Sequence, residues 1–353
     1  EAPVSRFALL DLMRQPESAF TGKIATYDVE ASGLGFLFAF MDSLEATTFG
    51  SLLEGFSRLQ AVATCCSAEI IDGVAEGRFF LRDDLDSPSG LAWGDDTLYV
   101  ANHDEVLAFE YELGATQVTG EGRKIADLAE GTDHWMRNLA LHPDGDRLYA
   151  AVGSKSNIGE DGMEIEQGRA LIWEINLETG RQRVFGAGLR NANGLDFSPW
   201  SGELWTTVNE RDMLGSDLVP DYLTNVPVGV HYGWPWIYYG DNFDRRVKYP
   251  IPQALSYVRT PEYALGPHVA ALGFVFSEEG ARMGPQFGSG AFVARHGSWN
   301  RKPASGYDVV YVAFDARGNP QGVQVEQELP VVVEQHRRGP VEAGSAEHRA
   351  TGA

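Results

Sequence analysis

Cysteine is nearly absent from this chain, which has two among its 353 residues, Cys65 and Cys66. Adjacent cysteines are poorly placed for an ordinary disulfide. The cysteine content therefore does not define a redox compartment. The chain opens at Glu1 without a basic segment that leads into an apolar one, so we expect that any export signal has already been removed or was never present.

Long apolar runs and an excess of basic side chains are also lacking. No run of about 18 apolar residues occurs, which predicts that nothing spans a membrane. Lys and Arg number 28 against 50 Asp and Glu, for a formal net charge of −22. Phosphate binding needs basic side chains in excess, so nucleic acid and anionic membrane surfaces are excluded as expected partners. A neutral substrate fits better, although high-salt habitats and simple solubility also explain such a charge.

Hydrophobic residues make up 43% and aromatic residues 11% of the chain, enough to bury a large core. A length prior of about 100 to 200 residues per domain suggests two domains, but all-β barrels and propellers often exceed it as one unit. Forty glycines and seventeen prolines are spread along the chain. This composition favours many short strands over long helices.

A repeated hairpin begins after Leu85. Apolar or β-branched runs separated by Gly, Pro or Asp turns predict hairpins in four copies, each built around one of the leucines that lie 48, 56 and 77 residues apart. These leucines are Leu91, Leu139, Leu195 and Leu272. Third strands are expected at 106–111, 170–175 and 309–314. A period near about 40 to 50 residues with several strands per unit indicates an all-β fold of the β-propeller type, with loop insertions on one face. A β-sandwich with irregular strands is the alternative.

Polar residues gather where the predicted strands end. The segment 190–194 is too polar for a core strand, so we expect it at a sheet end, where side chains can meet a ligand. The segments 153–157, 209–212 and 295–301 each follow the second strand of a unit. Equivalent strand ends in successive blades predict one shared mouth of a central channel. Surface turns with solvated charges are the alternative.

The two ends of the chain are less regular. We expect residues 1–84 to form part of the first blade or blades, with a strand within 21–29, and residues 85–335 to form the propeller body. Residues 336–353 read as a polar tail. A propeller that lacks strands has exposed edges. The terminal blades are therefore expected to be incomplete or irregular, with a ring that is open, closed by N-terminal strands or completed in another way.

Four ordered segments resemble those of the pyrroloquinoline-quinone (PQQ)-dependent soluble sugar dehydrogenases, the glucose/sorbosone dehydrogenase family. The likeness runs from about residue 85 to 320. The segments are Gly131–Asn138 (GTDHWMRN), Gly188–Asn191 (GLRN), Tyr232–Pro235 (YGWP) and His296–Arg301 (HGSWNR). The resemblance implies a six-bladed propeller, with the quinone on the channel mouth and a calcium ion beside it.

The resemblance also implies roles for individual residues. His134 matches the general base that takes the hydroxyl proton while hydride moves to the quinone, and an imidazole with a pKa near about 6.5 suits that task. Arg190 matches the arginine that contacts the quinone oxygen where negative charge develops, and Asn191 is its neighbour at the cofactor. A guanidinium is always cationic and offers fixed donors. Without the motifs, each would read as an ordinary packed or solvated side chain.

Further positions are implied for the cofactor and the ion. Arg301 and Lys155 are the candidate anchors for the carboxylates of the quinone. Main-chain carbonyls in the loop of Glu210 and Arg211 are the candidate Ca²⁺ ligands, because a hard cation prefers oxygen. The chain departs from some relatives near Ser154, where they carry an acidic residue that steadies the base.

The implied function is a quinoprotein sugar dehydrogenase. It would oxidise an aldose or a related, sorbosone-like sugar aldehyde to a lactone or acid and pass electrons to a separate acceptor, in the periplasm or outside the cell. One alternative is a propeller lactonase that uses a divalent metal ion, because 193–199 (NGLDFSP) is similar to the blade motif of such enzymes. The other is a non-catalytic propeller that binds a sugar or a protein. The sequence does not define an oligomeric state.

Overall fold

The computed structural model describes residues 21–25, 66–71, 74–82, 84–112, 115–131, 133–253, 255, 257–277, 287–322 and 329–330, and side chains from residue 81 to residue 322 within these ranges. The described residues contain strands and loops but no α-helix. The strands are β1 (Thr21–Ala25), β2 (Cys66–Ile71), β3 (Val74–Phe80), β4 (Gly90–Gly94), β5 (Thr97–Ala101), β6 (Glu105–Glu110), β7 (Arg123–Asp127), β8 (Leu139–Leu141), β9 (Arg147–Val152), β10 (Leu171–Asn176), β11 (Gln182–Ala187), β12 (Ala192–Phe197), β13 (Leu204–Val208), β14 (Pro220–Asn225), β15 (Val230–His231), β16 (Ile237–Tyr238), β17 (Asn242–Phe243), β18 (Tyr263–Pro267), β19 (Ala271–Ser277), β20 (Gly290–Arg295), β21 (Asp308–Ala313) and β22 (Leu329–Pro330).

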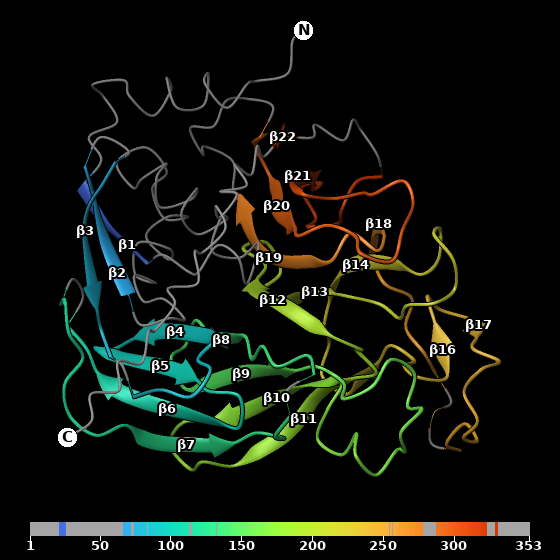
Figure 1. Ribbon diagram of the computed structural model, residues 1–353, viewed down its shortest axis with the longest axis horizontal. Coiled ribbons are helices and arrows are strands. Elements are labelled where there is room, and N and C mark those ends of the chain that lie inside the picture. The colour runs from blue at the N-terminus through green and yellow to red at the C-terminus, as the bar shows by residue number, and fades with distance from the viewer. Residues whose placement is uncertain are drawn as a thin grey trace, which may run out of the picture.

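Four antiparallel four-stranded units follow one another along the chain, and we call them blades 1 to 4. They are β4-β5-β6-β7, β8-β9-β10-β11, β12-β13-β14-β18 and β19-β20-β21-β22, and β15 adds a parallel edge strand to blade 2. β1, β2 and β3 form a three-stranded sheet, and β16 pairs with β17. Figure 1 shows the four blades side by side along an arc from β4–β7 to β19–β22. This arrangement confirms the predicted all-β propeller.

The predicted hairpins are present in all four blades. In blade 1, Leu91 pairs with Val100, and in blade 2, Leu139 pairs with Ala150. The third strands predicted at 106–111, 170–175 and 309–314 correspond to β6, β10 and β21. The outer strands β7, β11 and β18, and the whole of β14, were not predicted. Their charged or irregular sequences lack the alternation that marks a half-buried strand.

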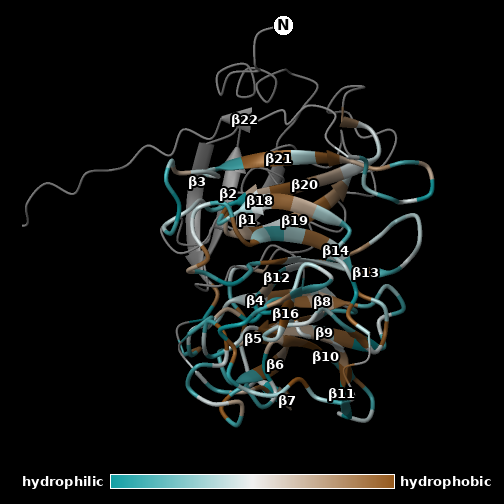
Figure 2. Ribbon diagram, turned by 90° about the vertical axis from the view of Figure 1, so that its right-hand side faces the viewer, coloured by the Kyte–Doolittle hydropathy of each residue, from teal (hydrophilic) through white to brown (hydrophobic). Residues whose placement is uncertain are grey.

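Neighbouring blades pack face to face through apolar side chains. The first strand of each blade contacts the first strand of the next, as for β4 with β8, β8 with β12 and β12 with β19. Buried residues from both partners form the three clusters between blades: Ala92, Tyr99, Leu139 and Leu148 between blades 1 and 2, Ala151, Ile172, Ala192 and Val208 between blades 2 and 3, and Trp205, Leu223, Phe274 and Val293 between blades 3 and 4. Figure 2 shows that hydrophobic residues are concentrated on the strands, whereas much of the length of the connecting loops is hydrophilic.

Glycine residues allow the first strand of one blade to approach the backbone of the next blade closely. A Cβ atom on Gly90 would lie 1.8 Å from the carbonyl oxygen of Arg137 in the segment leading to blade 2. A Cβ atom on Gly194 would lie 2.7 Å from the carbonyl oxygen of Leu272 in blade 4. Both contacts are with backbone, which cannot move aside as a flexible side chain can. Only the residue without a side chain fits at these two positions.

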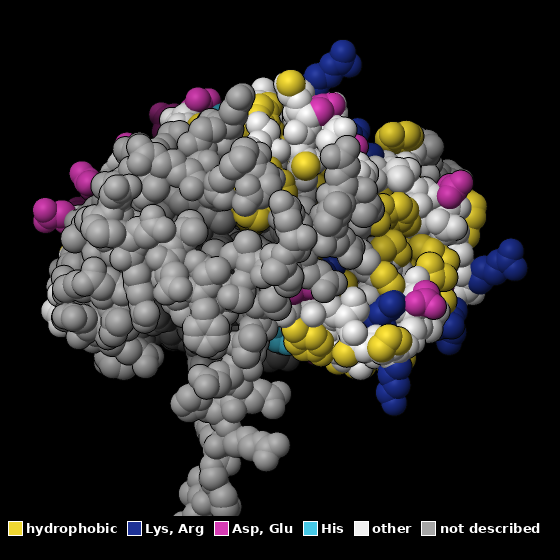
Figure 3. Space-filling model, turned by 90° about the horizontal axis from the view of Figure 1, so that it is seen from above, with side chains coloured by type: hydrophobic (Ala, Val, Ile, Leu, Met, Phe, Trp, Pro, Cys, Tyr) yellow, Lys and Arg dark blue, Asp and Glu magenta, His cyan; other side chains and the backbone are white. Residues whose placement is uncertain are grey.

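The surface is mixed in character. On the face seen in Figure 3, hydrophobic side chains lie among interspersed acidic and basic ones. In the part of the chain that the structure describes, no helix is long and apolar enough to cross a membrane. β1 lies within the strand predicted at 21–29. The segment 35–59 and the predicted tail at 336–353 lie outside the described residues.

Candidate active site

Loops from blades 2 and 3 meet around Arg190, which lies between β11 and β12, and a loop of blade 4 joins the same row. Arg190 Nη2 donates to Asn157 Oδ1 at 3.0 Å in the loop after β9, and to Asp212 Oδ2 at 3.2 Å in the loop after β13. Arg301, in the loop after β20, donates from Nη1 to the carbonyl oxygen of Ser216 at 2.6 Å. The strand ends that the sequence predicted to share one mouth are therefore joined by hydrogen bonds.

His134 lies in the segment between β7 and β8, with a positive φ of 42°. Its Nδ1 lies 2.8 Å from the carbonyl oxygen of Ser154 and 3.1 Å from Ser154 Oγ, whose own proton goes to the carbonyl oxygen of Ser156. Both neighbours of Nδ1 accept hydrogen bonds, so Nδ1 carries the ring proton. Nε2 of the neutral ring then has a free lone pair, and it makes no hydrogen bond to a described residue.

Ser154 therefore supplies the orienting contact for which the sequence offered no acidic residue. Burial, together with the nearby positive charge of Arg190, lowers the pKa of His134 to about 3. This pKa lies well below the ordinary value near about 6.5, because a cation and the loss of water both disfavour the imidazolium ion. The ring is neutral at neutral pH.

Two buried arginines hold the backbone of this segment. Arg137 is fully buried and donates from Nη1 to the carbonyl oxygen of His134 at 2.7 Å. Arg169 donates from Nη1 to the carbonyl oxygen of Gly153 at 3.2 Å, and both arginines bond the carbonyl oxygen of Ala129 from Nη2. Desolvation lowers the pKa of Arg137 to about 10. The motif that contains His134 thus also contains Arg137, whose side chain holds the backbone of His134 in place.

Asn191 and His134 both lie against Gly153. A Cβ atom on Gly153 would lie 2.4 Å from Asn191 Oδ1 and 2.6 Å from His134 Cβ, so glycine leaves room for both side chains. The backbone N–H of Ser154 donates to the carbonyl oxygen of Arg190 at 2.7 Å, which ties the two segments together. The side-chain amide of Asn191 makes no hydrogen bond to a described residue. It can therefore bond a ligand beside the imidazole.

Arg190 is buried, with all five of its N–H groups used inside the protein. Besides the two bonds from Nη2, its Nε donates to the carbonyl oxygen of Asn157 at 3.2 Å. Its Nη1 donates to the carbonyl oxygens of Asn209 at 3.3 Å and Glu210 at 2.7 Å. The implied contact with a quinone oxygen would have to share or replace one of these bonds. In this structure Arg190 joins loops and places a positive charge beside His134.

The two proposed carboxylate anchors differ in position. Lys155 directly follows Ser154 and forms an ion pair with Asp133, so it lies beside His134 and is one-third exposed. Arg301 lies farther along the row of loops, where Nη1 also approaches Asp217 Oδ1 at 3.0 Å. Arg301 Nη2 makes no hydrogen bond to a described residue. Both side chains keep donors that could meet an anionic ligand.

The two candidate calcium ligands, the carbonyl oxygens of Glu210 and Arg211, differ in their surroundings. The carbonyl oxygen of Glu210 already accepts from Arg190 at 2.7 Å, and a cation at that oxygen would lie beside a guanidinium. The carbonyl oxygen of Arg211 accepts no hydrogen bond from a described residue. The Arg211 side chain is buried and pairs with Asp244 at 2.9 Å, although the two groups are not aligned as a hydrogen bond. Of the two positions, Arg211 fits a carbonyl ligand better.

Buried carboxyl groups support the same loop. Asp221 accepts the backbone N–H of Glu210 at 2.8 Å and that of Ala270 at 2.7 Å, and Glu210 accepts the N–H of Arg211 at 3.0 Å. Burial raises the pKa of Glu210 to about 7 and that of Asp221 to about 6. These carboxyl groups act on the backbone and leave the carbonyl oxygen of Arg211 free.

Several residues of the site gave no signal in the sequence. Glu166 lies in a long loop but is buried, and it accepts the backbone N–H groups of Lys155 at 2.7 Å and Ser156 at 2.8 Å. Asn157 accepts the N–H of Asp212 at 2.9 Å and donates to its carbonyl oxygen at 3.2 Å. The only hint for Asn157 was its place after a predicted second strand.

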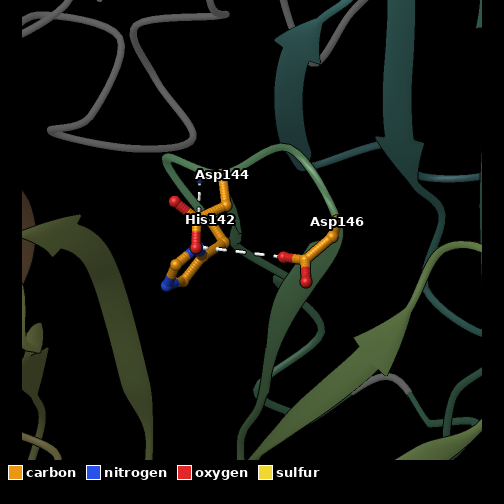
Figure 4. A group of neighbouring side chains, drawn as sticks. All are labelled: His142, Asp144 and Asp146. Carbon is orange, nitrogen blue, oxygen red and sulfur yellow. Dashed lines mark hydrogen bonds and ion pairs between the residues drawn. The ribbon is translucent and has the colours of Figure 1, made fainter.

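A separate acidic group lies in the turn between β8 and β9, at the other end of the blade from Ser154. His142 Nδ1 lies 3.3 Å from Asp144 Oδ2 and 3.9 Å from Asp146 Oδ1. Figure 4 shows the three side chains in the turn. The backbone N–H of Asp144 donates to the same Nδ1 at 3.1 Å, and Arg147 Nε donates to Asp146 at 2.8 Å. Arg147 Nη2 also donates to Asp144 Oδ2 at 3.4 Å, so the imidazole lone pair and both carboxylates already have partners within the turn.

The fold and the loops at Arg190 and His134 define a propeller of the kind found in soluble PQQ-dependent sugar dehydrogenases. The TrAA12-like family model matches residues 75–226 and 253–340. The chain belongs to this family, which confirms the resemblance read from the four motifs.

Individual relatives are distant. Solved structures of a Trichoderma reesei carbohydrate-active enzyme of family AA12 are 22% identical, with a TM-score of 0.59, over 70% of this chain and 71% of theirs. The PQQ domain of pyranose dehydrogenase from Coprinopsis cinerea is 20% identical, with a TM-score of 0.59, over 73% of each chain. An uncharacterised protein of Borreliella burgdorferi is 25% identical over 66% of this chain. This chain spans 63% of the length of that relative.

Proposed function

We propose that the protein is a PQQ-dependent oxidoreductase that oxidises an aldose or a related, sorbosone-like sugar aldehyde, with His134 as the general base. The observation that carries the proposal is the neutral imidazole of His134, whose free Nε2 lies in a site shared with Asn191 and with the charge of Arg190. PQQ, when bound, supplies the acceptor for the hydride. The remaining chemistry belongs to the protein.

His134 is prepared to take the proton. The contact from Nδ1 to Ser154 fixes the ring orientation and the tautomer, and it keeps the lone pair on Nε2 for a sugar hydroxyl. When the ring becomes an imidazolium ion, the same carbonyl oxygen and the carboxylate of Asp133 favour the charged form. Arg190 opposes this charge, so it favours release of the proton from the ring to solvent after turnover.

The donors of the site suit an anionic, planar cofactor. Asn191, Lys155 and Arg301 all keep side-chain donors, and a cofactor with several carboxylates needs them. The carbonyl oxygen of Arg211 is the candidate ligand for Ca²⁺. A separate electron acceptor and a periplasmic or extracellular location belong to the same proposal, by analogy with soluble sugar dehydrogenases.

The lactonase alternative receives no support from its motif. Asn193 Nδ2 donates to the carbonyl oxygen of Asn191 at 3.1 Å, and the carboxylate of Asp196 accepts the backbone N–H groups of Phe197 at 2.8 Å and Phe276 at 3.1 Å. Asp196 thus links blade 3 to blade 4. Residues used in this way are not free to hold a metal ion that activates water.

Reconstitution of the purified chain tests the proposal. Addition of PQQ and Ca²⁺ should give dye-linked oxidation of at least one sugar in a panel of aldoses and sorbosone. His134→Ala should lower turnover by about 10²- to 10⁴-fold, the usual contribution of a general base, while a spectral titration still shows PQQ binding. His142→Ala, in the distant turn, is the matched control and should keep full activity.

Three other outcomes would redirect the assignment. Bound PQQ without oxidation of any sugar in the panel contradicts the dehydrogenase. Lactone hydrolysis by the metal-loaded, quinone-free protein supports the lactonase. Failure to bind PQQ at all supports a propeller that has kept only a binding role.

A further inference from the structure

A second cavity lies beside β15, the outer edge strand of blade 2. Its volume is about 610 Å³, within the range of about 300–1,000 Å³ that is usual for small-molecule sites. The described residues that line it do not include His134, Arg190 or Asn191. Figure 1 shows the neighbouring hairpin of β16 and β17 at the outer margin of the molecule. Six lining residues are used below: Val228, His231, Trp236, Leu255, Tyr257 and Arg259.

Apolar side chains are exposed at this cavity. Tyr257 is 69% exposed and Val228 is 60% exposed, although both are large hydrophobic residues. Trp236 and Leu255 are partly buried and belong to the same wall. Exposed apolar side chains that gather at one place indicate a binding site, whereas single ones do not. The aromatic rings offer flat faces on which an apolar face of a ligand can pack.

The lining residues also carry hydrogen-bond donors. The backbone N–H of Gly233 donates to His231 Nδ1 at 2.9 Å, so Nδ1 has the lone pair and Nε2 of the neutral ring has the proton. His231 Nε2 makes no hydrogen bond to a described residue. The same is true of Trp236 Nε1 and Arg259 Nε, which are both buried. Buried donors are costly to leave without an acceptor, and an oxygen of a ligand would provide one.

The charges of the described lining residues are already balanced. Burial lowers the pKa of His231 to about 4, so its ring is neutral at neutral pH. Arg259 Nη2 pairs with Glu262 Oε1 at 2.5 Å and donates to Asn225 Oδ1 at 3.0 Å. An anionic ligand would therefore meet no unpaired cation, and the net charge of −22 would repel it. A neutral ligand that is rich in oxygen fits these surroundings.

We propose that this cavity is a second binding site, which holds a neutral sugar against Tyr257. A sugar ring has an apolar face of C–H groups that can pack on the phenol ring, and its hydroxyl groups can accept from His231 Nε2 and Trp236 Nε1. Neither part of the ligand requires a charge. The site goes beyond the proposed function, because it binds without a redox step and without the quinone.

Binding is measured by ¹⁵N–¹H NMR on the full chain with ¹⁵N-labelled tryptophan and no added quinone. Glucose, maltose and cellobiose are the probes, and 4-hydroxybenzoate is the anionic comparison. We expect the Trp236 indole correlation, assigned by its loss in Trp236→Phe, to shift with at least one of the sugars and not with the anion. An unshifted Trp236 correlation with all three sugars, or a shift with the anion alone, would overturn the proposal.

The stacking contact is measured by the Kd from the same titration. Tyr257→Ala should raise the Kd by about tenfold, since it removes a ring that is too exposed to support the fold. Tyr257→Phe is the matched control, because it keeps the ring, and it should bind as the wild type does. Equal Kd values for Tyr257→Ala and the wild type would overturn the proposed contact.

The two proposals fail independently. A PQQ-loaded protein that oxidises no sugar, although sugar still shifts Trp236, would contradict the proposed function and leave the second site intact. Oxidation of a sugar with no shift of Trp236 would overturn the second site and leave the proposed function intact.

Discussion

Glu166 offers the sharpest test of how the site is held. Its carboxylate accepts the backbone N–H groups of Lys155 at 2.7 Å and Ser156 at 2.8 Å, and the hydroxyl of Ser156 at 2.5 Å. Glu166→Ala leaves these donors without an acceptor. An unsatisfied buried donor costs about 1–3 kcal/mol. Two N–H groups therefore cost about 2–6 kcal/mol, with the lower end reached if water enters the space of the lost carboxylate.

Hydrogen exchange of the segment 153–160 measures this cost locally, without the assumption that the whole propeller unfolds in one step. A loss of about 3 kcal/mol in the opening free energy corresponds to roughly 100-fold faster exchange, because each 1.4 kcal/mol is a factor of about ten. Ser154 lies in this segment and orients His134, so the proposed sugar dehydrogenase activity should fall with it.

The matched control is Glu164→Ala, which removes a carboxyl group from an exposed position two residues away. It should leave both exchange and activity unchanged. Unaltered exchange at 153–160 in Glu166→Ala, or an equal effect of Glu164→Ala, would refute the idea that one buried carboxylate holds this loop.

Two further predictions concern the base and the space around it. Since the pKa of His134 is about 3, the imidazole is unprotonated at every pH well above that value, so protonation of His134 should not contribute to any loss of kcat/KM as the pH is lowered from 7 to 5. An acid limb centred near about pH 6.5 in the pH–rate profile, which His134→Gln abolishes, would contradict the low pKa. Gly153→Ala would place a methyl group 2.4 Å from Asn191 Oδ1 and 2.6 Å from His134 Cβ, and it should lower kcat by about 100-fold through displacement of the two side chains. Steady-state kinetics measure this effect. The control is Gly322→Ala, because a Cβ atom at Gly322 meets nothing within 4 Å. Equal kcat values in the two variants would show that the methyl group at position 153 does not displace the site.

The repeated hairpins could be predicted from the sequence because the alternation of apolar and polar residues and the turn residues involve positions close together in the chain. β4, β5, β6 and their counterparts in the other blades alternate apolar and polar side chains, or are continuously apolar where both faces are buried. The outer strands are different, since β7 (RKIAD) and β11 (QRVFGA) have exposed, charged residues. They form strands because their backbone N–H and C=O groups pair with the edge of the neighbouring inner strand. The local sequence pattern does not show this pairing.

The candidate active site likewise contains residues that the sequence indicated and residues that only the structure showed. Four ordered motifs predicted the family and brought His134, Arg190 and Asn191 to attention. The motifs gave no indication that Ser154 would orient the imidazole or that Glu166 would hold the loop from eleven residues away. A carbonyl oxygen or an isolated glutamate has no pattern of its own, so such contacts are invisible in a linear chain.

The sequence alone determined the class of fold, the family and the imidazole proposed to act as the base, because each depends on residues close together in the chain. Only the tertiary structure decided that Arg190 uses every donor on its neighbours and that His134 is neutral. The physical reason is that charge, burial and hydrogen-bond geometry are set by groups from separate blades. Their distances exist only once the blades have packed.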